Sequence, residues 1–255
     1  MGLRNIFKYF NLVGGNMRKA VVVYSGGMDS STLLAYVVSQ VYKVYAISFN
    51  YGQRHKKELD YAKKFAKQFA NVVEHKIIDI GVINELVQGS SLTTPAIAVP
   101  DGHYALETMK KTVVPNRNAI MLSLACGYAV SLCADRLFVG VHSGDHFIYP
   151  DCRPEFIEAI DKAFRLGNQG FASEDFRIVA PFMYSTKADI AKLGKQLGVD
   201  YSKTWSCYKG GDIHCGRCGT CFERREAFVL AGVSDPTKYK DNRQLDVIQK
   251  ETETK

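Results

Sequence analysis

Short apolar runs alternate with amphipathic stretches along most of this chain. The runs are rich in β-branched and aromatic residues and are followed by polar or turn-forming residues. This is typical of strands that are buried on both faces of a parallel sheet. The pattern predicts five strands, at Ala20–Tyr24, Val44–Phe49, Val73–Ile80, Arg136–Val141 and Arg177–Pro181.

The intervening stretches carry apolar residues at helical spacing. They predict a first helix through Leu33, Leu34 and Val37, and later helices at Lys56–Phe69, Asn118–Leu132, Pro154–Arg165, Ser185–Leu197 and Phe222–Leu230. Strands that alternate with helices of this length favour an α/β fold. We therefore expect a doubly wound, parallel, five-stranded sheet with right-handed crossovers.

The length and composition fit one main domain with a small appendage. The 255 residues are 46% hydrophobic and 23% charged, as in an ordinary globular protein. We expect an N-terminal extension at 1–16, a main domain at 17–203, a helical metal-binding appendage at 204–237 and a polar, frayed tail at 238–255.

The net charge of +7 suits an anionic ligand such as a nucleotide. Lys and Arg are scattered rather than gathered in a basic run, so a non-catalytic nucleic-acid-binding zinc protein is a weaker hypothesis. No apolar run is long enough to span a membrane. Asn5, Lys8 and Asn11 interrupt the first residues, which therefore make a poor signal peptide, and the cytoplasm is the expected location.

A glycine turn joins the first predicted strand to the first helix. Its sequence, SGGMDSS at 25–31, places two glycines where the backbone must turn sharply. The amides at the start of the following helix favour phosphate oxygens, and Asp29 is a candidate to hold Mg²⁺ beside them. The turn is neither a Walker A loop nor a Gly-x-Gly-x-x-Gly loop. The alternative is a tight turn that Asp29 or Ser30 merely caps.

Four cysteines near the C-terminus have the spacing of a metal site. Three of the seven cysteines lie within 215–221, which argues against a disulfide framework. Cys207, Cys215, Cys218 and Cys221 offer four thiolates, as a closed, structural Zn²⁺ site requires. An iron–sulfur cluster is the main competing interpretation, and His214 is an alternative to Cys207 as the fourth ligand. Cys126 and Cys133, in an apolar helix, are expected in the core.

The glycine turn carries a resemblance to known proteins. SGGMDS resembles the Ser-Gly-Gly-x-Asp-Ser loop of the N-type ATP pyrophosphatases, which include NAD, GMP and asparagine synthetases and tRNA thiolases. Further stretches follow in the order found in the 7-cyano-7-deazaguanine synthase family: FNYGQRH at 49–55, VPNRN at 114–118, YPDCRPEF at 149–156, STK at 185–187 and TWSCY at 204–208. The resemblance runs from about Lys19 to Ala231, with departures from the family pattern at Ile148 and around His142.

The resemblance implies roles for several residues. Asp29 and Lys187 would be catalytic, and ATP would contact Tyr24, Ser25, Gly26, Gly27, Met28, Asp29, Ser30, Ser31, Thr32, Leu33 and Leu34. The substrate would contact Arg54, Arg117, Asp145, Tyr149, Asp151 and Arg153. These side chains lie at predicted strand ends or helix starts, where ligands bind in open α/β sheets.

Each role has a competing explanation from the residues themselves. Arg117 can pair with an acidic residue, and Lys187 can be a solvated lysine of a first helical turn. Asp145 or Asp151 can accept hydrogen bonds from a guanine-like edge, but a lone Asp before a helix is more often an N-cap. Tyr149 or Phe147 is a candidate to stack on the base.

The family resemblance also implies a reaction. ATP, 7-carboxy-7-deazaguanine and ammonia would give 7-cyano-7-deazaguanine through carboxylate adenylation, amide formation and dehydration to the nitrile, in a homodimeric carbon–nitrogen ligase. A tRNA thiolase is the nearest alternative, but outside the cysteine cluster only Cys152 occupies a plausible cleft position. A second alternative is a related synthase that acts on another acceptor.

Overall fold

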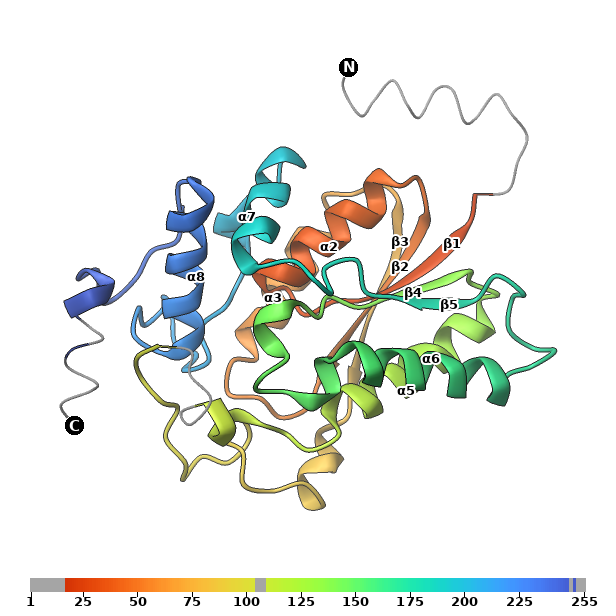
Figure 1. Ribbon diagram of the computed structural model, residues 1–255, viewed down its shortest axis with the longest axis horizontal. Helices are drawn as coiled ribbons and strands as arrows, with labels where there is room; N and C mark the ends of the chain where they lie inside the picture. Colours follow the sequence, from red (N-terminus) through yellow and green to blue (C-terminus); the bar gives the residue numbers. More distant parts are fainter. Residues whose placement is uncertain (1–16, 104–108, 248–249, 251–255) are drawn as a thin grey trace.

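The protein is a parallel five-stranded sheet with helices on both faces, as the computed structural model in Figure 1 shows. The structure describes residues 17–103, 109–247 and 250, so the extension predicted at 1–16 lies outside it. The strands are β1 (Lys19–Val23), β2 (Lys43–Asn50), β3 (Val72–Asp79), β4 (Arg136–Phe138) and β5 (Arg177–Val179). All four strand pairings are parallel.

Helices connect and cover the strands. They are α2 (Met28–Ser39), α3 (Lys57–Ala66), α5 (Arg117–Ser131), α6 (Pro154–Gly167), α7 (Lys187–Gln196) and α8 (Gly219–Ala231). Short 3₁₀ helices are η1 (Gly81–Glu85), η2 (Lys110–Thr112), η3 (Ser143–Asp145), η4 (Pro150–Cys152) and η5 (Tyr201–Lys203). The predicted α/β fold and its five strands are confirmed, with element ends that differ by a few residues.

The strand order is β3-β2-β1-β4-β5, so the chain builds outwards from β1 on one side and then on the other. The order reverses between β1 and β4, and ligands of open α/β sheets bind outside the carboxyl ends of the strands at such a point. β4 ends at Phe138, earlier than predicted. Two residues later Gly140 lies against the start of α2, where a Cβ on Gly140 would be 3.8 Å from Ser30 Cα.

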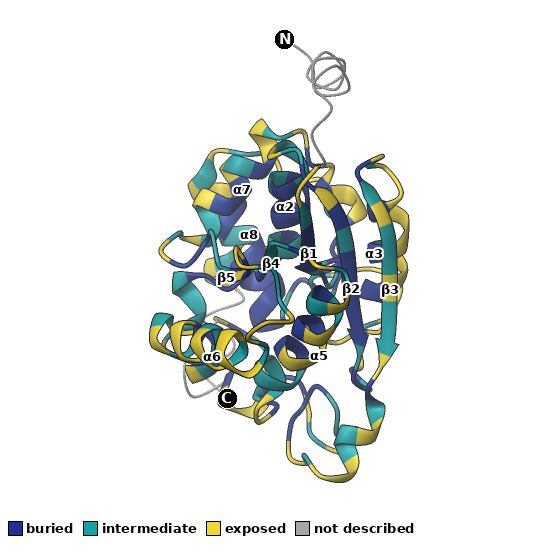
Figure 2. Cartoon of the chain, turned by 90° about the vertical axis from the view of Figure 1, so that its right-hand side faces the viewer, coloured by how far each residue is buried: buried dark blue, intermediate teal, exposed yellow. Residues whose placement is uncertain are grey.

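Two apolar layers enclose the sheet because successive strand residues point to opposite faces. Val21 contributes to the layer that includes α5 and α6, whereas Ala20 and Val22 contribute to the layer that includes α2, α3, α7 and α8. Figure 2 shows the buried strands between these two sets of helices. Among the described residues, no helix is both long and apolar enough to cross a membrane.

The C-terminal part packs tightly on the main domain through a buried arginine. Arg224 in α8 is 1% exposed and donates hydrogen bonds to Tyr201 O, Thr204 Oγ1, Ser206 Oγ and Thr237 Oγ1. A buried guanidinium is stable only when such acceptors replace water. Arg224 therefore fixes the segment that leads into the cysteine cluster.

Two further predictions, one on Cys133 and one on the C-terminal tail, are wrong. Cys133 is exposed, because it follows the end of α5 in a left-handed conformation with φ 50°; Cys126 is buried as predicted. The tail is not frayed from residue 238, because Tyr239 is 9% exposed and the amides of Lys240 and Asp241 donate to His214 O and Cys215 O. This segment covers the cysteine cluster.

Candidate functional site

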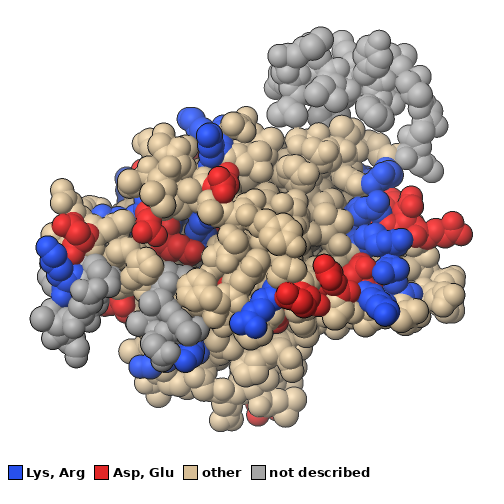
Figure 3. Space-filling view, in the orientation of Figure 1, with Lys and Arg blue, Asp and Glu red and all other residues tan. Residues whose placement is uncertain are grey.

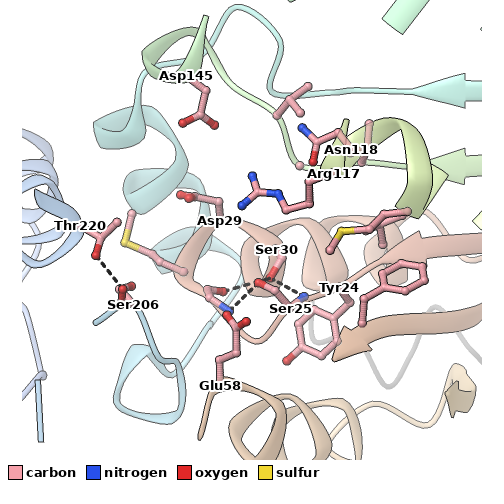
Figure 4. Close-up of a pocket in the computed structure, with 18 of the residues that line it drawn as sticks. Tyr24, Ser25, Asp29, Ser30, Glu58, Arg117, Asn118, Asp145, Ser206 and Thr220 are labelled. Atoms are coloured by element: carbon pink, nitrogen blue, oxygen red, sulfur yellow. Dashed lines mark hydrogen bonds between the residues drawn. The ribbon is translucent and has the colours of Figure 1, made fainter. Parts of the chain in front are cut away.

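A pocket of about 240 Å³ lies at the carboxyl ends of the central strands. Its walls come from the turn after β1, the end of β2, the start of α5, the segment after β4 and the region around the cysteine cluster (Figure 4). The pocket therefore occupies the position where the sheet topology reverses, and it unites sequence segments that lie far apart in the chain.

The turn after β1 forms one side of the pocket, and its shape requires glycine. Gly26 has φ 91°, and a Cβ there would lie 2.4 Å from Glu58 O and 2.8 Å from Ala62 N. The first amides of α2, which begins at Met28, have no acceptor within the helix. These amides can donate hydrogen bonds to an anion such as a phosphate, and the positive end of the helix also attracts it.

Serine hydroxyls hold the turn in shape. Ser30 Oγ accepts hydrogen bonds from the amides of Ser25 and Gly26, both at 3.2 Å, and Ser25 Oγ accepts one from Gly27 N at 3.2 Å. The turn is therefore preformed, and the Ser30 hydroxyl serves the turn itself as well as facing the pocket.

The predicted ATP-contacting residues divide into three groups. Six of them line the pocket: Tyr24, Ser25, Gly27, Met28, Asp29 and Ser30. Gly26 shapes the turn. Ser31, Thr32, Leu33 and Leu34 are fully buried behind it and do not line the pocket. Thr32 instead bonds Met28 O and Tyr201 Oη.

Asp29 and Lys187 meet at the charged end of the pocket. Asp29 Oδ2 lies 3.3 Å from Lys187 Nζ, whereas Asp29 Oδ1 is buried without a hydrogen-bond partner among the described residues. Lys187 begins α7, which a capping box between Thr186 and Asp189 holds in place. The two residues predicted to be catalytic are therefore in contact.

Glu223 from α8 completes this charged group, although the sequence analysis did not single it out. Its Oε2 lies 2.5 Å from Lys187 Nζ. Burial by itself lowers the pKa of Lys187, but the carboxylates of Asp29, Glu223 and Asp145 raise it above its usual range. Burial raises the pKa of Glu223, and Lys187 opposes that effect. Lys187 is therefore held as a cation between Asp29 of α2 and Glu223 of α8.

His142 links Asp29 to Asp145. Its Nδ1 accepts a hydrogen bond from Gly144 N at 3.1 Å, so the ring proton lies on Nε2. Nε2 lies 3.4 Å from Asp145 Oδ2 and 3.8 Å from Asp29 Oδ2. Of the residues predicted to bind substrate, Asp145 thus lies in the pocket, at its charged end.

Arg117 occupies the opposite part of the pocket among aromatic rings. Its guanidinium carbon is 5.9 Å from the Tyr51 ring centroid and 5.8 Å from that of Tyr149. His55 and Tyr208 also line the pocket, with ring centroids 4.9 Å apart. This end offers a cation and flat apolar surfaces, which suit a planar anionic ligand.

The structure does not bring the other predicted substrate residues to the pocket lining. Tyr149 is buried behind Arg117, and its hydroxyl bonds Thr112 Oγ1. Asp151 accepts from Asn118 N at 3.1 Å, so it caps the start of α5. Arg54 binds the carbonyls of a neighbouring loop, and Arg153 Nε donates to His146 O. Phe147, the alternative stacking residue, is 49% exposed.

The four predicted thiols form one compact cluster. The Sγ atoms of Cys207, Cys215, Cys218 and Cys221 all lie within 4.8 Å of one another. Four thiolates around a single ion with bonds of about 2.3 Å would be separated by roughly 3.8 Å. The cluster therefore fits one metal ion, whereas a multi-iron cluster would hold the thiolates further apart.

Backbone amides support thiolate ligands in this cluster. The amides of Arg217 and Cys218 donate to Cys215 Sγ, and Cys215 N donates to Cys207 Sγ. His214 is not a ligand, because its Nε2 accepts from Ser206 N at 3.0 Å and its ring packs on Trp205 at 4.2 Å. Cys207, rather than His214, is the residue that joins the other three thiols in the cluster.

Comparison with known proteins places the chain in a family. The sequence profile described as "Queuosine biosynthesis protein QueC" matches residues 19–232. The chain belongs to the QueC family. A relative from Pseudoalteromonas atlantica, named 7-cyano-7-deazaguanine synthase, is 53% identical over 223 residues, covering 88% of this chain and 99% of the relative. One from Rhizobium etli with the same name is 55% identical, covering 88% and 92%.

One solved structure that is similar to this QueC family member is more distant in sequence. The NH3-dependent NAD synthetase of Campylobacter jejuni is 17% identical, covers 80% of this chain and 76% of its own, and gives a TM-score of 0.44. A similarity at this level carries no information on function. The QueC match, in contrast, includes both the turn after β1 and all four clustered cysteines.

Two pocket-lining residues of this family member, Glu58 and Thr220, had no role predicted from the sequence. Glu223, which contacts Lys187 but does not line the pocket, had none either. No motif marked Glu223, although it lies two residues after Cys221, one of the four clustered cysteines. Its partner in α7 was not visible in the sequence.

Proposed function

We propose that this protein is an ATP-dependent 7-cyano-7-deazaguanine synthase, a ligase that converts 7-carboxy-7-deazaguanine and ammonia to the nitrile. One observation carries the proposal beyond the family match. The preformed turn, the Asp29–Lys187 pair and Arg117 face a single pocket, so that a nucleotide and a carboxylate can meet there.

The turn would bind the phosphates of ATP. Amides at the start of α2 would contact phosphate oxygens, and the Lys187 ammonium would neutralise part of their charge. Asp29 suits Mg²⁺, because its buried Oδ1 lacks a partner among the described residues and carboxylate oxygen is a ligand that Mg²⁺ prefers. Bound Mg²⁺ would supply charge neutralisation of the phosphates.

The chemistry explains why ATP is needed. A carboxylate is a poor electrophile, because oxide or hydroxide would have to leave. Attack of the carboxylate oxygen on the α-phosphorus forms an acyl-adenylate and releases pyrophosphate. Ammonia then adds at the acyl carbon, the C–O bond to AMP breaks, a proton is lost and the amide results. This chain contributes position and charge rather than a nucleophile.

The amide must then lose water to become a nitrile. Adenylation of the amide oxygen by a second ATP would convert it to a leaving group. Loss of two protons from nitrogen and departure of AMP would give the carbon–nitrogen triple bond. The same turn and Lys187 would serve both adenylations, because each one releases pyrophosphate.

The cysteine cluster would bind Zn²⁺ in a structural role. Four thiols within 4.8 Å leave no open coordination position, and α8, which carries Cys221, also carries Glu223. The metal would therefore hold one wall of the pocket. We further propose a cytoplasmic homodimer, as the family resemblance implies; light scattering on the purified protein tests the dimer.

The alternative functions lack the features that they require. A tRNA thiolase needs a pair of sulfur-carrying cysteines at the nucleotide, and Cys152 is the one cysteine among the described residues that lines the pocket. Burial raises the pKa of that thiol well above its usual range. A nucleic-acid-binding protein needs a clustered basic surface, but acidic side chains interrupt the Lys and Arg residues on the face in Figure 3.

A direct assay tests the proposal. The protein is incubated with 7-carboxy-7-deazaguanine, ammonium and Mg-ATP, and mass spectrometry follows the base and the spent nucleotide. The expected products are the amide, then the nitrile, with AMP and pyrophosphate. Unchanged base in the presence of all three substrates would refute the function, and a product from a different acceptor would support a related synthase.

A further inference from the structure

Glu58 is a buried carboxylate that the proposed ATP chemistry does not use. It lies in the first turn of α3, is 7% exposed and lines the pocket (Figure 4). Its Oε1 accepts a hydrogen bond from Gln53 Nε2 at 3.0 Å, and Gln53 also bonds Phe49 O and Tyr51 N at the end of β2. His55 Nε2 lies 3.4 Å from the same oxygen. The carboxylate is therefore fixed, through Gln53, to the carboxyl end of β2.

The other oxygen of Glu58, Oε2, has no hydrogen-bond partner within the part of the chain that the structure describes. No Lys or Arg there forms an ion pair with Glu58 either. Burial raises the pKa of this carboxyl to about 8. A carboxyl that is fixed through one oxygen and open at the other, in a pocket wall, is a place where a ligand can add hydrogen bonds.

The surroundings restrict what that ligand group can be. The phosphates of ATP offer only acceptors and would be repelled by an ionised Glu58, so a ligand that binds the ionised carboxylate must be a hydrogen-bond donor. The rings of His55 and Tyr208 are adjacent, and the Tyr51 ring is 6.4 Å from that of His55, so the wall suits a planar molecule. Figure 4 places Glu58 and Arg117 on opposite sides of Ser25 and Ser30.

We propose that Glu58 recognises the donor edge of the deazaguanine base, while Arg117 holds the carboxylate of the same molecule. The N1–H and exocyclic N2 amine are adjacent donors, which a carboxylate can accept together. The carboxylate at position 7 lies on the other side of the ring system, where a guanidinium can bind it. This inference rests on the proposed function, and it assigns a specificity-determining residue to that function.

The assignment also distinguishes the base from the nucleotide. The two adjacent donors of the deazaguanine edge favour the ionised form of Glu58 and would lower its raised pKa on binding. The corresponding edge of adenine places a donor beside an acceptor, and the ionised carboxylate cannot satisfy both. Asp151 and Asp145, the carboxylates first considered for this role, are engaged elsewhere: Asp151 accepts from Asn118 N, and Asp145 faces His142. Glu58 has an oxygen left for a ligand.

Calorimetric titration of Glu58→Gln tests the proposal on the full-length protein. The base is titrated into protein saturated with Mg²⁺ and an α,β-methylene ATP analogue, which cannot transfer its nucleotidyl group. Glu58→Gln is expected to weaken base binding at least about 100-fold, because the amide presents a donor to a donor. Affinity for the ATP analogue should stay within about threefold. The matched control is Asp60→Asn, which removes an exposed carboxylate from the same helix.

A modified base separates recognition from folding. 7-Carboxy-7-deazahypoxanthine lacks the N2 amine, so the wild-type protein should bind it at least about tenfold more weakly than the guanine analogue. Glu58→Gln should lose that preference. Glu58→Asp, which retracts the carboxylate by one methylene group, provides a second variant, and circular dichroism establishes that each variant is folded.

Each result is decisive. If Glu58→Gln keeps the wild-type preference for the N2 amine, Glu58 does not recognise the base. If affinity for the ATP analogue falls instead of affinity for the base, Glu58 belongs to the nucleotide site and the proposal is overturned. If the wild type makes the nitrile while the variants bind the base normally, only this inference fails. If the wild type neither binds the base nor produces nitrile, the proposed function fails with it.

Discussion

Lys187 Nζ lies 2.5 Å from Glu223 Oε2, so the helix that carries Cys221 also holds the lysine of the proposed phosphate site. Asp29 approaches the same ammonium at 3.3 Å from the other side. The cluster of thiols and the turn after β1 are thus connected through one side chain.

Replacement of Glu223 by Gln tests this connection. The variant keeps the size of the side chain but leaves Lys187 paired mainly with Asp29, which shifts the ammonium away from its shared position. We expect kcat to fall about 10- to 100-fold with little change in the KM for the base. Steady-state kinetics measure both quantities. Glu226→Gln, in the same helix, is the control, and equal losses in the two variants would show that Glu223 has no special position.

Replacement of Asp29 by Ala removes the carboxylate with the unpartnered buried oxygen. We expect kcat to fall at least about 100-fold, because charge stabilisation at the phosphates is lost, while the thermal unfolding midpoint changes little. Turnover close to that of the wild type, in a variant with an unchanged circular dichroism spectrum, would remove the turn from the active site.

Replacement of Cys218 by Ser opens the cluster of thiols. The variant should lose its metal, measured by elemental analysis, and its Tm should fall by about 10 °C, which corresponds to roughly 3 kcal/mol for a chain of this size. Cys133→Ser changes an exposed cysteine outside the cluster and should alter neither quantity. A metal-free wild type with the same Tm as the metal-loaded protein would contradict a structural metal.

Replacement of Gly26 by Ala introduces a methyl group where backbone already lies. A Cβ there would be 2.4 Å from Glu58 O, and the φ of 91° is unfavourable for any L side chain. The free energy of unfolding, measured in urea, should fall by at least about 2 kcal/mol. Gly127→Ala in α5 is the control: no atom outside the neighbouring backbone of its own helix lies within 4 Å of its Cβ position, so this substitution should stabilise the protein by about 0.5–1 kcal/mol.

The buried carboxyl of Glu58 predicts a pH dependence of stability. Its pKa is raised from 4.5 to about 8 by burial, so the folded state binds a proton more tightly than the unfolded state. That contribution is complete below about pH 4.5 and is lost as the pH rises through 8. The ligand-free, metal-loaded protein should therefore lose up to about 1 kcal/mol per pH unit between pH 6.5 and 8.

Urea unfolding of Glu58→Gln at the same pH values isolates this effect. Folding lowers the pKa of His55 from 6.5 to about 3, so protonation of His55 in the unfolded state adds a slope of opposite sign near pH 6.5. His55 is present in both proteins, so comparing their slopes isolates the contribution of Glu58. The slope should be smaller in Glu58→Gln than in the wild type by the amount that Glu58 contributes. Identical slopes in the two proteins would show that Glu58 does not titrate in this range.

The sequence by itself determined the sheet, the turn and the thiol cluster. Each is a local property: β-branched runs form buried strands, Gly26 and Gly27 permit the turn, and the close spacing of the cysteines allows four thiols to cluster. Strand ends were less predictable, because Val141 has strand character, yet the chain leaves the sheet at Phe138.

Only the tertiary structure decided which polar side chains share the pocket. Arg54 and Arg153 seemed suited to an anion from their motifs, but backbone carbonyls bind both. Glu58 and Glu223 belonged to no recognised motif. Packing of α3 places Glu58 in the pocket wall, and packing of α8 places Glu223 against Lys187. Contacts between side chains from distant segments depend on how the helices pack. Hydrophobic periodicity predicts which face of a helix is buried, but not which polar groups come into contact.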